Sequence, residues 1–152
     1  MKNYGYACIN MGFSSRPKSK RITTNRTMIK RTFKERGIKY ASELAIQNMQ
    51  DLRKILEWNL DNDIYFYRIS SDIIPWASEY DLEDMPNYED IKHAALVAGD
   101  FARQHNMRLT SHPGPFNKLA SPKERVFNLT AKDLTVHADM FDLIGLPRTP
   151  YA

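Results

Sequence analysis

Cysteine is nearly absent from this sequence of 152 residues, in which Cys8 is the single representative. One thiol excludes an internal disulfide framework and a cysteine-rich zinc site, and it fits a protein of the reducing cytoplasm. Long apolar runs are also missing, since none approaches the roughly 20 residues that a membrane-spanning helix needs. The first residues carry no apolar segment of the kind found in secretory signal peptides. We therefore expect a cytoplasmic protein that does not associate with membranes.

The glycine-rich signatures of nucleotide-binding α/β proteins are missing as well, because the sequence contains neither a GxGxxG motif nor a Walker loop. Hydrophobic residues make up 42% of the chain and aromatic residues 11%. This composition supports one folded domain, which we place at residues 1–152. The length is well below the about 250 residues of a complete eight-unit α/β barrel.

Positive charge is concentrated in one segment. From Gly12 to Lys39 the sequence has ten basic residues and one acidic residue, a net charge of +9, whereas the whole chain carries +4. The remainder is therefore mildly acidic. A basic arm on an acidic body favours a polyanionic partner such as nucleic acid, and a solvated basic loop is the alternative.

Hydrophobic periodicity predicts an alternation of strands and helices. Brief apolar and aromatic runs predict strands at residues 4–10, 64–69 and 107–111. Apolar residues at three- and four-residue steps predict helices at residues 26–33, 43–60, 88–105 and 122–144. This order is typical of an α/β fold with parallel strands and crossover helices.

Capping residues mark several of these boundaries. Thr23–Asn25 precede the first helix, and Gly37 ends it. Ser121 is expected to be the N-cap of the last helix, since proline follows it and glutamate stands three residues later. Gly145 is expected to supply the C-terminal cap of that helix.

Polar residues follow each predicted strand, where parallel α/β folds place their reactive groups. Asn10 follows the first strand, Asp72 the second and His112 the third. His112 precedes a Pro-Gly-Pro loop, a position that suits a metal ligand or a general base, and a hydrogen-bonded structural histidine is the alternative. Asp72 could equally cap the following turn. We interpret the histidines inside the helical patterns, His137 among them, as structural.

Six groups of residues carry a resemblance that covers nearly the whole chain. In chain order they are YACINM at 6–11, TTNRT at 23–27, RISSDIIPW at 68–76, HPG at 112–114, LASPKE at 119–124, and HA with DLIGLP at 137–138 and 142–147. Each motif is weak alone, but the ordered set resembles the ultraviolet damage endonucleases. The resemblance implies a TIM-like (β/α) barrel akin to the xylose isomerases and endonuclease IV, of which about three βα units are present here.

The resemblance also implies an activity. The family is a group of DNA repair enzymes that cut the phosphodiester bond on the 5′ side of UV photoproducts, with a cluster of divalent ions, Mn²⁺ or Zn²⁺, in the mouth of the barrel. Such ions generate hydroxide near neutral pH and stabilise the leaving oxygen, and nitrogen and carboxylate ligands suit them. Damaged double-stranded DNA is therefore the expected partner.

Site residues follow from the resemblance position by position. His112 matches a metal ligand, and Glu79 stands where relatives have a metal-binding histidine. Tyr6 and Asn10 match active-site positions near the lesion. Phe116 matches an aromatic wedge that unstacks DNA bases, preceded here by Pro115 instead of glutamine. The residues expected to contact DNA phosphates are Arg16, Lys18, Lys20, Arg21 and Arg26.

The length predicts that this chain is the N-terminal portion of such an endonuclease, either truncated or completed by a second polypeptide. Three barrel strands leave sheet edges that invite association. One alternative is a non-catalytic DNA-binding fragment that keeps the basic arm and the wedge loop. Another is a sugar isomerase or epimerase relative with the same barrel.

Overall fold

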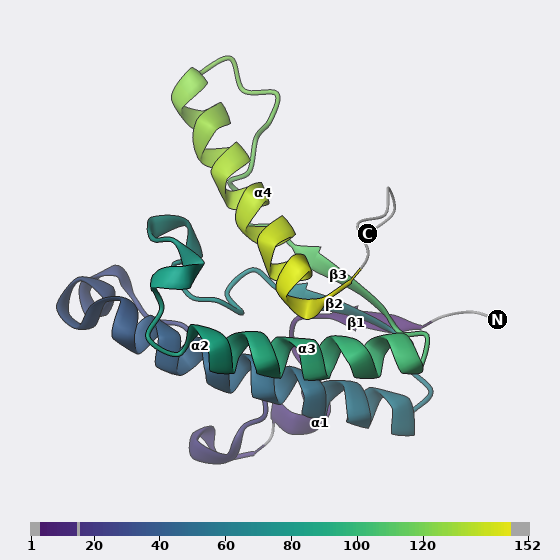
Figure 1. Cartoon of the computed structure of the whole chain (residues 1–152). Coiled ribbons are helices and arrows are strands. Elements are labelled where there is room, and N and C mark those ends of the chain that lie inside the picture. Colours follow the sequence, from purple (N-terminus) through teal and green to yellow (C-terminus); the bar gives the residue numbers. More distant parts are fainter. Residues whose placement is uncertain (1–3, 15, 147–152) are drawn as a thin grey trace.

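A computed structural model describes residues 4–14 and 16–146, and within them three strands form one parallel sheet (Figure 1). The predicted parallel α/β arrangement is confirmed, because each strand is connected to the next through a helix. The sheet is open in the described residues, in the order β1 (Gly5–Ala7), β2 (Phe66–Ser70) and β3 (Arg108–His112).

The register of the sheet determines which polar residues meet at its C-terminal edge. Ser70, at the end of β2, lies opposite His112, at the end of β3. β1 is shorter than the predicted strand 4–10, because Cys8 adopts a left-handed backbone with φ of 61° and so leaves the extended conformation. The Cys8 N–H still donates to the carbonyl oxygen of Arg68 at 2.8 Å.

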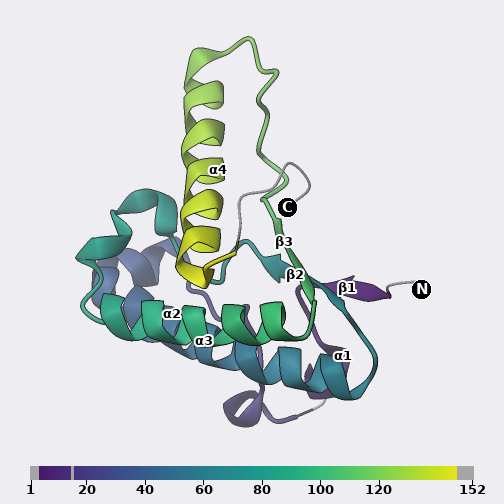
Figure 2. The ribbon, with the colours of Figure 1, turned by 45° about the vertical axis from the view of Figure 1, so that its right-hand side comes forward.

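Two long helices, α2 (Lys30–Asp61) and α3 (Tyr88–Gln104), lie side by side against one face of the sheet (Figures 1 and 2). Apolar side chains recur at three- and four-residue steps on both helices, as the predicted helices 43–60 and 88–105 require. The core between the two layers consists of fully buried side chains that include Leu52, Ile55, Leu56, Tyr67, Ile69, Ile91 and Ala98.

The first helix, predicted at residues 26–33, starts later than predicted. α2 begins only at Lys30, and it is interrupted at Gly37, whose φ of 62° and ψ of −161° suit glycine. The predicted break at Gly37 is therefore confirmed. Thr24, expected to cap the helix, is instead buried, and its hydroxyl hydrogen-bonds to the Tyr67 hydroxyl at 3.0 Å.

Short helical turns lie in segments that the sequence predicts as loops. A single turn gives too few positions for a periodic hydrophobic pattern, which is why these turns escape prediction. They are α1 (Met11–Ser14), η1 (Lys18–Lys20), η2 (Ala77–Glu79) and η3 (Leu82–Asp84).

The last helix, α4 (Glu124–Ile144), meets α3 at its C-terminal end. A Cβ atom at Gly99 would lie 1.7 Å from the carbonyl oxygen of Ile144, so only glycine permits this approach of the two helices. Gly145 adopts φ of 70° and caps α4 as predicted. The predicted N-cap is wrong: Lys123 occupies that position, and the Ser121 hydroxyl accepts the Lys123 N–H at 3.2 Å.

The N-terminal half of α4 extends away from the sheet and from the two long helices (Figure 2). The segment that leads to it, residues 113–123, is called the β3–α4 loop below. None of the helices in the described ranges combines the length and the apolar character that crossing a membrane requires.

Candidate functional site

The C-terminal edge of β2 and β3 carries the polar residues that the sequence predicts there. His112 ends β3 beside Ser70, and Asp72 follows β2 two residues later. The amide of Asp72 donates to the Ser70 hydroxyl at 3.2 Å, which fixes the turn after β2. Parallel pairing therefore brings the chain after β2 and the imidazole-bearing end of β3 to one edge of the sheet.

Two polar residues of α4, Asp133 and His137, interact electrostatically with residues at this edge. Asp133 and His137 are one helical turn apart, and His137 Nε2 lies 3.7 Å from Asp133 Oδ2. Burial lowers the pKa of His137, the charges of Asp133 and Asp72 oppose that change, and His112 adds to it. Desolvation and the charge of Asp133 raise the pKa of Asp72, while His137 lowers it. His137 is therefore near enough to Asp133, Asp72 and His112 for their charges to influence its protonation.

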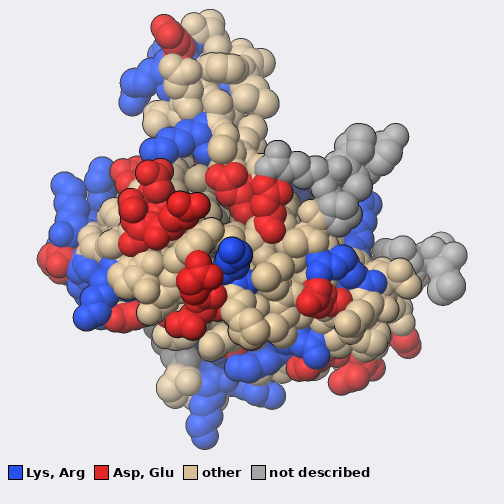
Figure 3. All heavy atoms as spheres, viewed as in Figure 1, with Lys and Arg blue, Asp and Glu red and all other residues tan. Residues whose placement is uncertain are grey.

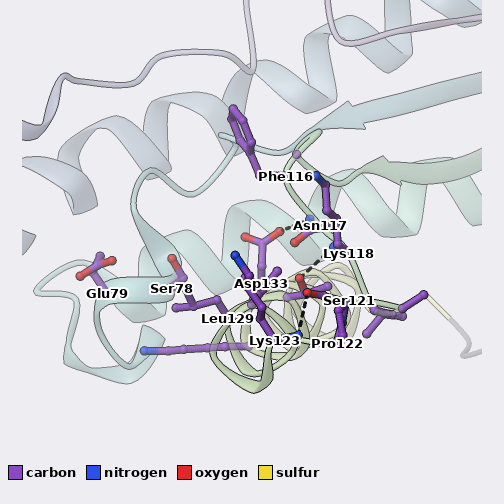
Figure 4. Close-up of a pocket in the computed structure, with 16 residues that line it drawn as sticks. Ser78, Glu79, Phe116, Asn117, Lys118, Ser121, Pro122, Lys123, Leu129 and Asp133 are labelled. Carbon is purple, nitrogen blue, oxygen red and sulfur yellow. Dashed lines mark hydrogen bonds between the residues drawn. The ribbon is translucent and has the colours of Figure 1, made fainter.

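The two predicted metal ligands lie on different elements. His112 ends β3, whereas Glu79 is exposed at the end of η2. Glu79 lines a cavity of about 1260 Å³ between η2, the β3–α4 loop and α4 (Figure 4). Within residues 4–14 and 16–146, no three His, Cys, Asp or Glu side chains are grouped closely enough to hold an ion. His112 and Glu79 have suitable donor chemistry, but they do not form a metal site by themselves.

Tyr6 and Asn10 form one hydrogen-bonded group with the end of α2. The Tyr6 hydroxyl donates to Asn59 Oδ1 at 2.6 Å, and Asn10 Nδ2 donates to the Tyr6 hydroxyl at 2.7 Å. Burial raises the pKa of Tyr6 to about 12, although the hydrogen bonds from Asn10 and to Asn59 oppose the change. The phenol therefore stays protonated near neutral pH. The structure brings these two predicted residues together against α2, and their catalytic role stays a prediction.

The predicted basic arm divides into exposed and internally bonded residues. Arg26 forms an ion pair with Asp51 at 2.6 Å, and Asp51 is only 6% exposed, so this guanidinium fixes the arm to α2. Arg16, Lys20 and Arg21 are exposed, and their predicted phosphate contacts remain open to test. The side chain of Lys18 lies outside the part of the chain that the structure describes.

Charge is segregated on the surface shown in Figure 3. Lys and Arg atoms gather over the N-terminal part of α2 and the loop before it, whereas Asp and Glu atoms gather over the turns η2 and η3. The acidic residues of these turns and their flanks are Glu79, Asp81, Glu83 and Asp84. The predicted separation into a basic arm and an acidic body is thus visible on one face.

The β3–α4 loop exposes its aromatic residue and anchors its neighbours. Phe116 is 85% exposed, and Pro115 before it is exposed too. Asn117 Nδ2 donates to Asp133 Oδ2 at 2.6 Å, and the Lys118 N–H donates to the Thr130 hydroxyl at 2.9 Å. In Figure 4 the Phe116 ring points away from the side chains of Asn117 and Asp133.

α4 contributes residues to this region that were not predicted from the sequence. The three residues that face the loop and the strand ends are Thr130, Asp133 and His137. Their spacing of three and four residues places them on one face of a helix, among apolar positions that face the core. Polar residues in that pattern are a signal that could have identified them.

Comparison with known proteins decides which fold family this arrangement represents. The model of the UV-endonuclease UvdE family matches residues 2–152. The chain belongs to this family. The predicted resemblance to the ultraviolet damage endonucleases is therefore confirmed.

Two relatives and one solved structure of the UvdE group show how far the similarity extends. The UV DNA damage endonuclease of Clostridium perfringens is 33% identical over 88% of this chain and 32% of its own length. The UV-damage endonuclease of Schizosaccharomyces pombe is 35% identical over 93% of this chain and 23% of its own length. The crystal structure of SacUVDE matches 93% of this chain and 45% of that chain, with a TM-score of 0.79 and 29% identity. The chain thus spans about a third or less of the length of these two relatives.

Proposed function

We propose that this chain supplies the first βα units of a DNA repair endonuclease that acts on UV-damaged DNA. The observation that carries the proposal is the UvdE family match over residues 2–152, together with relatives named as UV-damage endonucleases. Two structural features agree with a DNA partner: Phe116 is exposed on the loop after β3, and basic residues gather before and along the start of α2.

The finer parts of the proposal concern fold and reaction. We propose that the three parallel strands belong to a TIM-like barrel of the xylose isomerase and endonuclease IV type. The remaining strands would come from polypeptide outside the described residues, in the same chain or in a second one. The proposed reaction is hydrolysis of the phosphodiester bond on the 5′ side of the photoproduct, with Mn²⁺ or Zn²⁺ as the metal.

His112 and Glu79 are the metal-binding residues that this chain would contribute. An imidazole and a carboxylate suit Mn²⁺ and Zn²⁺. Since the described residues contain no group of three ligands, the two donors do not complete an ion site. In this proposal the remaining ligands come from outside residues 4–14 and 16–146, and this chain contributes two ligands together with the residues that bind and probe the DNA.

Phe116 has the role of a wedge in this proposal. An exposed aromatic ring on a loop can enter a base step that a lesion has already weakened, because unstacking costs least at damaged bases. Arg16, Lys20 and Arg21 would bind backbone phosphates, which gives affinity that is independent of sequence and falls with salt. Affinity thus comes from the arm, and lesion preference comes from the loop.

The test of lesion binding compares two duplexes of the same sequence, one of which carries a thymine dimer. Fluorescence anisotropy with the 152-residue chain is expected to show tighter binding of the damaged duplex. Phe116→Ala should remove the preference and leave binding of the undamaged duplex nearly unchanged. Phe127→Ala, which truncates another exposed phenylalanine on α4, is the matched control and should keep the preference. Equal affinity for both duplexes in the parent chain would refute the proposal.

The test of cutting supplies the strands that the proposed barrel needs beyond the three described here. The chain is mixed with a polypeptide that carries the later part of a related endonuclease, and nicking of the damaged duplex is followed with and without Mn²⁺. A product cut on the 5′ side of the dimer, lost with His112→Ala, is the expected result. The alternative is a non-catalytic DNA-binding fragment, which would use the exposed Phe116 and the exposed basic residues without any cutting. It predicts salt-sensitive DNA binding that survives His112→Ala without any nicking.

A further inference from the structure

In the β3–α4 loop, Phe116 follows a proline, and the two residues after it are hydrogen-bonded to α4. The Asn117 N–H donates to the Gly114 carbonyl oxygen at 3.3 Å, which closes a turn with Pro115 and Phe116 at its centre. Proline at the second position of a turn presets the backbone angle that the turn requires. Phe116 therefore stands at the tip of a closed turn, where its ring is exposed.

Two hydrogen bonds attach the end of this turn to α4. Asn117 donates to the Asp133 carboxylate at 2.6 Å, and the Lys118 N–H donates to the Thr130 hydroxyl at 2.9 Å (Figure 4). Thr130 is only 3% exposed, so its hydroxyl lies where an unmade hydrogen bond would be costly. A carboxylate acceptor gives a stronger bond to the Asn117 amide than a neutral acceptor would. The donors of both bonds are the two residues that directly follow Phe116 in the chain.

A second turn follows the anchored residues. The Ser121 N–H donates to the Lys118 carbonyl oxygen at 3.2 Å, so Asn117 and Lys118 lie between two turns. Most other side chains in the loop are exposed, including Leu119. The turn at 114–117 has little apolar packing of its own. Its order therefore depends on Pro115 and on the hydrogen bonds between the loop and α4.

We propose that Thr130 and Asp133 are positioning residues that hold the turn at 114–117, so that Phe116 meets the DNA duplex in an ordered conformation. The inference rests on the proposed function and extends it from the wedge to the helix behind it. A wedge that is ordered before binding loses less conformational entropy when it enters the duplex. Lesion preference should then depend on α4 residues that do not themselves contact DNA.

The first part of the test measures loop order without DNA. A nitroxide is attached at Phe116→Cys in a Cys8→Ala background, and its mobility is followed by electron paramagnetic resonance. Thr130→Val and Asp133→Ala each remove one acceptor and should give narrower, more mobile spectra. Thr130→Ser keeps the hydroxyl and should restore the parent spectrum. Thr135→Val is the matched control, because the Thr135 hydroxyl donates to Ala131 within α4 itself.

The second part measures the ratio of affinities for damaged and undamaged duplexes with unlabelled proteins that retain Phe116. Thr130→Val and Asp133→Ala should each reduce the preference by about threefold to tenfold, the effect of one hydrogen bond. Thr135→Val and Thr130→Ser should leave it unchanged. A purely structural role of α4 would weaken both affinities equally and would keep the ratio constant.

Asn117→Ala keeps the test decisive if the helix variants fail to fold, because it removes the bond to Asp133 from the loop side. Folded variants, verified by circular dichroism, whose spectra match the parent would overturn the proposal. Greater mobility with an unchanged affinity ratio would overturn it too. If the parent chain does not distinguish the two duplexes, the proposed function fails, and the spectra alone then decide whether α4 orders the loop.

Discussion

Two regions of this molecule are stabilised by different means. Between the sheet and the helices α2 and α3, fully buried apolar side chains pack against one another. At the β3–α4 loop, exposed side chains such as Phe116 and Leu119 are carried by a backbone that is fixed at a few hydrogen bonds. The first region gains its stability from removal of apolar area from water, and the second from a small number of directed contacts.

The comparison shows why the residues proposed to contact DNA lie where the packing is sparse. A wedge must be accessible, so Phe116 cannot contribute to the core. The structure compensates by anchoring its neighbours to α4, which in turn is fixed to α3 at the close approach of Gly99 and Ile144. The stable layer thus positions the exposed loop through a single helix.

The largest effect is expected for a truncation in the packed layer. Leu52 is fully buried between α2 and the sheet, so Leu52→Ala should lower the free energy of unfolding by about 2–5 kcal/mol. Leu119→Ala makes the same change at a side chain that is 55% exposed and should shift stability by less than about 0.5 kcal/mol. Urea denaturation followed by circular dichroism measures both. Equal losses would show that the loop is packed as tightly as the core.

The ion pair between Arg26 and Asp51 is expected to have an intermediate effect. Arg26→Ala leaves a nearly buried carboxylate with Lys54 as its remaining charged partner at 2.8 Å, and should cost roughly 1–3 kcal/mol. Arg31→Ala is the control, because Arg31 and Glu35 are both exposed and 3.8 Å apart, so its cost should be close to zero. A loss of DNA affinity with Arg26→Ala at unchanged stability would instead assign Arg26 to the DNA interface.

Alkaline pH provides a test of the Tyr6 group. Because burial raises the pKa of Tyr6 from its usual value of 10.0 to about 12, the unfolded chain ionises first as pH increases. The stability contributed by the neutral phenol is therefore fully present below pH 10 and is lost between pH 10 and about 12. Tyr6→Phe should make the unfolding free energy less dependent on pH in that range, whereas Tyr4→Phe, at an exposed position, should not. Urea titrations at several pH values check this result.

The same contrast explains how much of the fold could be predicted. The helices 43–60 and 88–105 have long amphipathic patterns, and the structure confirms them within a few residues, together with the parallel strands. The segment 11–29 has few apolar residues, and its conformation depends on distant partners. Asn48 on α2, for example, accepts the Arg26 N–H at 3.1 Å and donates to the Arg26 carbonyl oxygen at 2.9 Å. Local sequence carries no signal for such contacts.

Within the candidate site, the residues at the strand ends could be placed from the sequence. His112 beside Ser70 follows from parallel register alone. The roles of Thr130 and Asp133 could not be derived in the same way, because their spacing fits a helix face but does not specify which loop they bind. Tyr6 and Asn10 likewise depend on Asn59, which lies about 50 positions away in the chain.

The smallest effect is expected at the start of α4, where the predicted cap and the observed cap differ. Lysine has no acceptor atom, so Lys123 at the N-cap position leaves the first amides of α4 to other partners. Lys123→Ser should therefore raise the free energy of unfolding by roughly 0.5–1 kcal/mol, the usual gain from a capping hydroxyl. Ser121→Ala should cost less than this, since the Ser121 hydroxyl accepts a hydrogen bond from a single amide at 3.2 Å outside the helix.

If Ser121→Ala instead costs about 1 kcal/mol and Lys123→Ser gains nothing, Ser121 is the N-cap of the helix in solution, as the sequence predicts. The anchored loop would then be shorter by two residues.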